Sequence, residues 1–191
     1  MKKYLVMAVM AFLSLAASAQ VEPGFRMGAR VNLGLSNVGG EGDKATFGYG
    51  VGWVAEYNFT PSFYVQSGLG LENIAHKEDA IDGTINAFYL QLPIHAGYRF
   101  SLGETSSLFL QAGPTLGIGL FGSDIEFYGA GKINYFDVAK RFDLGVGGRI
   151  GVEFSKFQIS VGGNYGVLKA IKNVDASYHN YSVNLSVGYM F

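Results

Sequence analysis

The chain of 191 residues contains no cysteine and few charged residues. Without cysteine it cannot form disulfides, thiol nucleophiles or cysteine-ligated metal sites, and it cannot carry the lipid-modified cysteine of a lipoprotein. Charged residues make up 15% of the sequence and nearly cancel, leaving a formal net charge of −1. This balance gives no electrostatic basis for binding nucleic acid, which requires a basic surface.

Long hydrophobic runs are also scarce. The apolar run at residues 4–15 is too short to cross a bilayer as a helix, which takes about 20 residues. It follows Lys2 and Lys3 and precedes the small residues Ala17, Ser18 and Ala19, the pattern of a secretory signal peptide. We expect a signal peptide at residues 1–19 and one domain over residues 20–191. A membrane-spanning form of this domain would have to use strands.

Glycine and aromatic residues are abundant, with 28 Gly and 15% aromatics, and hydrophobicity alternates with a period of two. In residues 181–191 the odd positions are apolar or aromatic and the even positions are mostly small or polar. Such alternation predicts a β-strand with one apolar face. The pattern recurs in seven earlier segments: 24–35, 46–59, 63–73, 86–100, 107–121, 141–154 and 157–168. We therefore predict an all-β fold, an eight-stranded antiparallel up-and-down transmembrane β-barrel.

The connections between these strands alternate in length. Short turns are expected at residues 60–62, 101–106 and 155–156, and long polar loops at 36–45, 74–85, 122–140 and 169–179. In an up-and-down barrel alternate connections lie at the same end, so the short turns share one rim and the long loops the other. Aromatic residues concentrate near both rims, as they do at membrane interfaces. Short periplasmic turns and long extracellular loops are typical of outer-membrane barrels.

Two soluble folds are alternatives. The apolar face could be the core of a β-sandwich, since Phe and Tyr are good strand formers, but the signal peptide and the loop asymmetry would then be coincidental. A lipocalin would have to enclose the apolar face, and so many large side chains would overfill an eight-stranded barrel.

The polar rows carry four positive and four negative residues, which would face the barrel interior. An eight-stranded barrel is just wide enough for side chains to fill it, so we expect a closed or nearly closed lumen. Buried charges should be paired, because an isolated one is costly. Four of them near the turn end, at positions 26, 56, 99 and 153, are expected to form one cluster. The predicted lumenal network comprises Arg26, Arg30, Glu56, Glu72, Arg99, Asp143, Arg149 and Glu153.

Catalytic and metal-binding motifs are weak. The three histidines are far apart in sequence and show no H-x-x-H spacing, so we predict no catalytic residue, metal or cofactor. His76, Glu78 and Asp79 could imitate the loop residues of an outer-membrane protease. His95 would face the lumen without the serine partner that a lipid-A-modifying enzyme needs. A barrel enzyme is therefore the least favoured alternative.

The longest loop, residues 122–140, carries four aromatic residues among polar ones and glycine. They could form an exposed contact surface or fold back to cap the lumen. We expect a monomeric, non-enzymatic protein with a structural role or a protein partner at its loops, and a narrow porin-like channel is the alternative. The candidate contact residues are Phe127, Tyr128, Tyr135 and Phe136.

Several segments resemble the PorT-like outer-membrane β-barrel family. The run from Tyr89 to Ile94, Tyr-Leu-Gln-Leu-Pro-Ile, followed by Gly-Tyr-Arg-Phe at 97–100, looks like the signature of its fourth strand. Residues 112–114, 142–145, 151–154 and 164–167 are also similar to that family. The final strand, with Tyr189 and Phe191, resembles an outer-membrane sorting signal.

This resemblance implies export to the cell outer membrane. It also implies insertion by the barrel-assembly machinery and contact with outer-membrane lipids and lipopolysaccharide. Some members take part in protein secretion.

Overall fold

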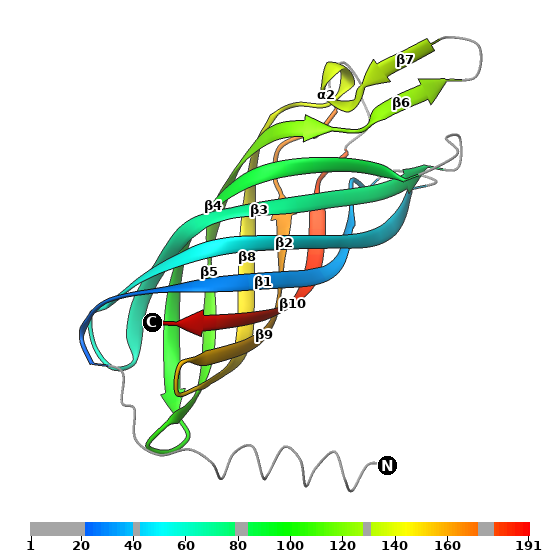
Figure 1. The fold of residues 1–191 in the computed structure, drawn as a ribbon. Coiled ribbons are helices and arrows are strands. Elements are labelled where there is room, and N and C mark those ends of the chain that lie inside the picture. The colour runs from blue at the N-terminus through cyan, green and yellow to red at the C-terminus, as the bar shows by residue number, and fades with distance from the viewer. Residues whose placement is uncertain (1–21, 40–42, 79–83, 128–130, 172–177) are drawn as a thin grey trace, which may run out of the picture.

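Eight strands close into an antiparallel barrel in the computed structural model, which describes residues 22–39, 43–78, 84–127, 131–171 and 178–191 (Figure 1). Each barrel strand pairs with the barrel strands before and after it in sequence, and the last closes against the first, which confirms the predicted fold class. The expected signal peptide lies outside the described residues. The barrel strands are β1 (Gly24–Asn37), β2 (Asp43–Asn58), β3 (Phe63–Glu78), β4 (Ile85–Ser101), β5 (Ser106–Gly122), β8 (Phe142–Phe154), β9 (Phe157–Gly166) and β10 (Tyr181–Met190).

The alternation in sequence sets which face of each strand points outward. In β10 the side chain of Val183 is 59% exposed, whereas Ser186 is 1% exposed. The outward rows of the other strands are likewise apolar and exposed, from Phe25 in β1 to Val161 in β9. A soluble protein rarely leaves so much contiguous apolar surface uncovered. We interpret the outer surface as the face that contacts lipid tails.

Aromatic rings line both rims of this outer surface. At the turn end the rings of Phe59 and Phe63 lie 5.6 Å apart across the β2–β3 turn. At the loop end Phe88 and Phe121 stack at 4.7 Å. These positions match the predicted interfacial girdles, where aromatic side chains favour the level of the lipid headgroups.

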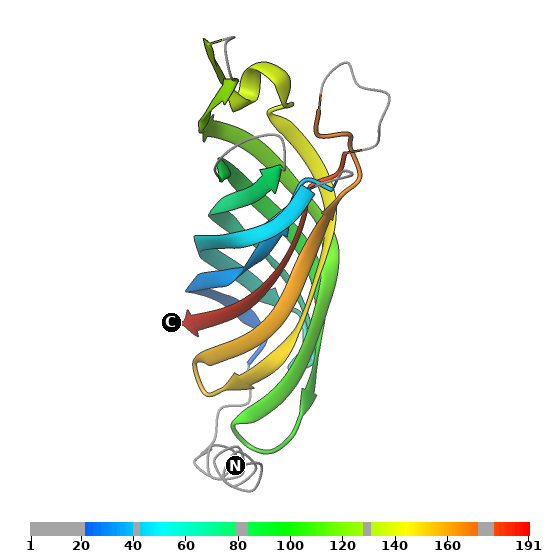
Figure 2. The same cartoon turned by 90° about the vertical axis from the view of Figure 1, so that its right-hand side faces the viewer.

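The longest loop contains ordered structure that the alternation did not predict. A hairpin of β6 (Asp124–Phe127) and β7 (Gly131–Asn134) leads into a four-residue helix, α2 (Tyr135–Val138). All three lie at the loop end of the barrel (Figure 1, Figure 2). The Asn134 side chain accepts a hydrogen bond from the Phe136 amide, and the Asp137 carboxylate accepts one from the Asn134 amide, forming a capping box. Among the described residues, no helix has the length and apolar character needed to cross a membrane.

The second long loop is shorter than expected. The predicted loop at residues 74–85 loses half of its length to the strands, because β3 continues to Glu78 and β4 begins at Ile85. His76, expected in a loop, is therefore a buried strand residue whose ring lies 5.7 Å from that of Tyr135. Asp79 lies outside the described residues, so nothing places the protease-like trio together.

Candidate functional site

Strand pairing builds a charged cluster across the lumen at its turn end. Arg26 and Glu56 face one another on β1 and β2, and the guanidinium Nε donates to Glu56 Oε1 at 2.6 Å. The two terminal nitrogens of Arg26 reach Glu153 on the opposite wall at 2.7 and 2.8 Å. Arg99 joins the same two carboxylates, at 2.6 Å to Glu56 and 3.2 Å to Glu153. The structure thus brings together all four residues expected at this end.

Neutral side chains complete the hydrogen bonding of this cluster. Gln158 lies opposite Glu153 on β9 and donates to its Oε2 at 2.8 Å, while Gln66 donates to Glu56 at 3.1 Å. The Arg99 guanidinium also stacks 3.9 Å from the centre of the Tyr64 ring. The predicted lumenal network contained only ionisable residues, so it did not include these neutral partners. They occupy inward-facing positions of their strands, as the charged residues do. The result is a neutral plug in which Glu56, Arg99 and Glu153 are buried and the Arg26 side chain is 15% exposed.

The four remaining lumenal charges are not paired with one another, contrary to the prediction that every one would be. Within the part of the chain that the structure describes, Arg30, Glu72, Asp143 and Arg149 form no ion pair within 4.0 Å. Amides serve as their partners instead. Arg30 donates to Gln66 at 2.7 Å and to Gln158 at 3.3 Å. The partners of the other three are Asn32 for Glu72, Asn184 for Arg149 and Asn180 for Asp143.

Glycines on the intervening strand allow two of these contacts. Glu72, Gly50 and Asn32 are aligned across β3, β2 and β1, and a side chain at position 50 would collide with the Glu72 carboxylate. Arg149, Gly162 and Asn184 are aligned in the same way across β8, β9 and β10.

At position 162 a Cβ would lie 3.0 Å from Arg149 Nε. Each long side chain therefore passes over a glycine to reach an amide two strands away.

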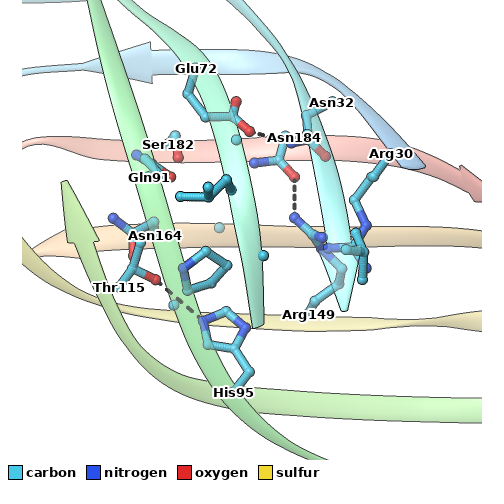
Figure 3. Close-up of a pocket in the computed structure, with 18 of the residues that line it drawn as sticks. Arg30, Asn32, Glu72, Gln91, His95, Thr115, Arg149, Asn164, Ser182 and Asn184 are labelled. Carbon is cyan, nitrogen blue, oxygen red and sulfur yellow. Dashed lines mark hydrogen bonds between the residues drawn. The ribbon is translucent and has the colours of Figure 1, made fainter. Parts of the chain in front are cut away.

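A polar cavity of about 80 Å³ lies in the middle of the lumen (Figure 3). Its wall includes Arg30, Glu72, His95 and Arg149, and His95 Nε2 lies 3.3 Å from the Thr115 hydroxyl. Four buried atoms of residues in the wall have no hydrogen-bond partner: Asn32 Oδ1, Asn73 Oδ1, Arg149 Nε and Asn164 Oδ1. In the described residues no three His, Cys, Asp or Glu side chains gather as a metal site would require.

Aromatic side chains of α2 cover the loop end of the lumen. Tyr135 and Phe136 are each 3% exposed and pack on inward-facing residues of the strands. The Phe136 ring lies 5.6 Å from that of Tyr89, and the Arg141 guanidinium stacks 4.6 Å from its centre. Residues of this aromatic cap, as we name it, are Ile74, Ile85, Ala87, Tyr89, Tyr135, Phe136 and Ala139.

The cap decides between the two interpretations of the loop aromatics. Tyr135 and Phe136 fold back onto the lumen, so the exposed-contact interpretation is wrong for these two residues. The reason is the capping box at Asn134, which begins a helix and turns the next two rings inward. Phe127 lies in β6, and Tyr128 falls outside the described residues, so their role as contacts stays a prediction.

Comparison with known proteins supports this architecture. The family described as outer membrane protein beta-barrel domain matches residues 5–191. None of the curated protein sequences matches the chain.

Solved structures that share the fold have low sequence identity to this chain. Neisserial surface protein A is 14% identical with a TM-score of 0.55, covering 88% of this chain and 97% of that one. OprG from Pseudomonas aeruginosa is 13% identical with a TM-score of 0.51, covering 91% and 99%. Ail, the attachment invasion locus protein of Yersinia pestis, is 18% identical with a TM-score of 0.50, covering 90% and 100%.

Proposed function

The chain belongs to the outer membrane protein β-barrel domain family, and we propose that it is a closed, non-enzymatic barrel whose role is structural or partner-binding. The observation that carries this proposal is that side chains block the lumen at both ends. The neutral cluster of Arg26, Glu56, Arg99 and Glu153 fills the turn end, and the aromatic cap covers the loop end. A lumen filled in this way leaves the loops as the part of the molecule that meets the cell exterior.

The β6–β7 hairpin is the proposed binding element. Its base is attached to the barrel, since Asn134 donates to the Gly122 carbonyl at 3.1 Å and the Tyr135 amide donates to the Ser123 carbonyl at 3.1 Å. A hairpin fixed at its base loses less conformational freedom on binding than a free loop. We place the contact at Phe127 and Tyr128, because the other two loop aromatics are used to hold the hairpin.

Substitution of Tyr128 tests this role. Tyr128→Ser should reduce chemical crosslinking to surface partners and reduce adhesion of cells, while the heat-modifiable migration of the folded barrel stays unchanged. Tyr178→Ser, which removes a tyrosine from a different long loop, is the matched control. Equal crosslinking and adhesion in both variants and the parent would contradict binding by the hairpin. Phe136→Ser is unsuitable, because it would disrupt the cap.

A narrow channel is the second candidate, and the polar cavity between the two blocked ends favours it. Recording in planar bilayers separates the two. The closed barrel predicts no stable current, and reproducible unitary steps from purified folded protein would support conduction instead. Modification of lipid A or cleavage of peptides by the same preparation would favour an enzyme.

The lipid and assembly partners are inferred from the apolar outer face and the family of the barrel. We propose that the apolar outer face contacts outer-membrane lipids and lipopolysaccharide, that the barrel-assembly machinery inserts it, and that it works as a monomer. A PorT-like role in secretion stays a prediction. Loss of exported proteins from the medium of a deletion strain would support that role, and an unchanged set of exported proteins would argue against it.

A further inference from the structure

The cavity in the middle of the lumen holds more positive than negative charge. Two guanidinium groups line it, those of Arg30 and Arg149, against the single carboxylate of Glu72. Two cations minus one anion leave a surplus of one positive charge before His95 is counted. Figure 3 shows Arg30 and Arg149 on the same side of this cavity, with Glu72 across from them.

The other carboxylates of the lumen do not neutralise this surplus. Glu56 and Glu153 are each bonded to both Arg26 and Arg99 in the turn-end cluster. Asp143 is not among the residues of the cavity wall, and its Oδ2 accepts a hydrogen bond from Asn180 at 2.9 Å. The charges of the lumen therefore balance overall, but they do not balance within the cavity.

Arg149 is the cation whose hydrogen bonding is least complete. Its terminal nitrogen donates to Asn184 at 3.3 Å, a long bond, and its Nε is buried without a partner. Arg30, by contrast, is 7% exposed and is held by two glutamine carbonyls. A buried charge that lacks a counter-charge is strongly destabilising in a medium of low dielectric constant. A guanidinium N–H facing a polar cavity is also a ready donor to an anion.

We propose that this cavity binds one small monovalent inorganic anion, of which chloride is the probe, beside the guanidinium group of Arg149. One negative charge cancels the surplus of one positive charge. A volume of about 80 Å³ has room for an ion of this size with several waters, at roughly 10–15 Å³ for each water-sized sphere. Gluconate, a bulky organic anion, is too large to enter.

Equilibrium unfolding tests the site. The full-length protein, folded in phosphocholine vesicles, is unfolded with urea in sodium chloride or in sodium gluconate at the same ionic strength. Chloride at ten times its dissociation constant should raise the ratio of folded to unfolded protein about tenfold over gluconate. Identical unfolding curves in the two salts would overturn the proposal and leave a cavity that holds water alone.

Two variants change the surplus in opposite directions. Arg149→Gln lowers it to zero and should abolish the difference between chloride and gluconate. Glu72→Gln raises it to two and should enlarge the difference beyond that of the parent protein. Each variant supplies a result if the other fails to fold. A chloride effect that persists in Arg149→Gln, or that shrinks in Glu72→Gln, would overturn the proposal.

The position of the ion can be measured directly. Crystals grown in bromide should give an anomalous scattering peak inside the cavity, beside the guanidinium group of Arg149. A peak confined to the protein surface would overturn the proposal.

Discussion

Arg26 holds Glu153 with both of its terminal guanidinium nitrogens, at 2.7 and 2.8 Å, although the two residues are 127 positions apart in sequence. The bond crosses the lumen from β1 to β8, two strands that are not neighbours in the barrel. A bidentate pair of this kind fixes geometry as well as charge. It therefore links opposite walls of the barrel at the turn end.

Removing one member of this pair should lower the unfolding free energy more than removing both members. Arg26→Met leaves Glu56 and Glu153 with one guanidinium between them, and the loss of a partner from a buried pair costs about 3–5 kcal/mol of unfolding free energy. Arg26→Met combined with Glu153→Gln leaves Arg99 and Glu56 as a neutral pair and should recover much of that loss. Urea unfolding in vesicles measures both. Strictly additive effects of the two substitutions would mean that the residues are not coupled.

The aromatic cap depends on the missing side chain at position 119. A Cβ there would overlap ring atoms of Phe136, which Tyr89 and Arg141 already confine from two other sides. Gly119→Ala should therefore displace α2 and lower the unfolding free energy by about 1–3 kcal/mol, the usual cost of overpacking. Trypsin should cleave the folded protein faster after Lys140 and Arg141.

The matched control for the cap is Gly103→Ala in the β4–β5 turn. A Cβ at position 103 would meet no atom within 4 Å, so the same substitution adds a methyl group without a clash. Its cleavage rate and unfolding free energy should equal those of the parent protein. Equal cleavage of the Gly119→Ala and Gly103→Ala variants would mean that Phe136 does not hold the loop in place.

Phe191 and Tyr189 are predicted to act as a membrane-insertion signal. The Phe191 ring packs outside the barrel, 5.3 Å from Trp53 and 5.7 Å from Tyr189. Phe191→Ala should lower the amount of folded protein in the membrane of cells. Phe100→Ala removes a comparably exposed ring, which lies 4.9 Å from Tyr98, and should leave assembly in cells unchanged.

Refolding separates recognition from stability in this pair of variants. If Phe191 is read by the assembly machinery, both purified variants should refold from urea into vesicles to the same extent, because no machinery is present there. A defect of Phe191→Ala that is equally large in vesicles would reduce its role to ordinary packing against Trp53.

The barrel could be predicted from the sequence because a period of two is a property of each strand alone. Alternation assigns every strand residue to the inner or outer face, so it predicted directly which charged residues face inward. It does not say how high in the lumen a side chain lies, since that depends on the stagger between strands. The general expectation that buried charges pair therefore fails for Arg149 and Glu72, because each side chain crosses a glycine to an asparagine instead.

The structure of the longest loop could not be read in the same way. A helix of four residues is too short to show a hydrophobic period, and the burial of Tyr135 and Phe136 depends on contacts with strands far away in sequence. One local signal was available: Asn134 precedes Asp137 by three residues, which is the spacing of a capping box. That signal could have located the start of the helix, but not the surface on which it packs.

Ser36 hydrogen-bonds to the backbone at an irregular point of the barrel wall, and its hydroxyl should contribute to the unfolding free energy. The pairing of β2 with β3 shifts between Ala45 and Gly50, which leaves the backbone of Ala75 without its regular partners there. The hydroxyl of Ser36, itself 2% exposed, accepts from the Ala75 amide at 2.7 Å and donates to its carbonyl at 2.9 Å. Ser36→Ala leaves both groups buried and unsatisfied, so we expect the unfolding free energy to fall by about 1–3 kcal/mol.

The control for this prediction is Ser101→Ala. Ser101 is exposed and its hydroxyl donates only to a turn carbonyl, that of Gly103, at 2.9 Å. Water can replace that bond, so the change in unfolding free energy should stay within about 0.5 kcal/mol. Because both substitutions remove one hydroxyl, the difference between them isolates the bonds to Ala75. Amide hydrogen exchange at Ala75 should also accelerate in Ser36→Ala alone, and exchange as slow as in the parent protein would show that the shifted strands satisfy this backbone without the serine.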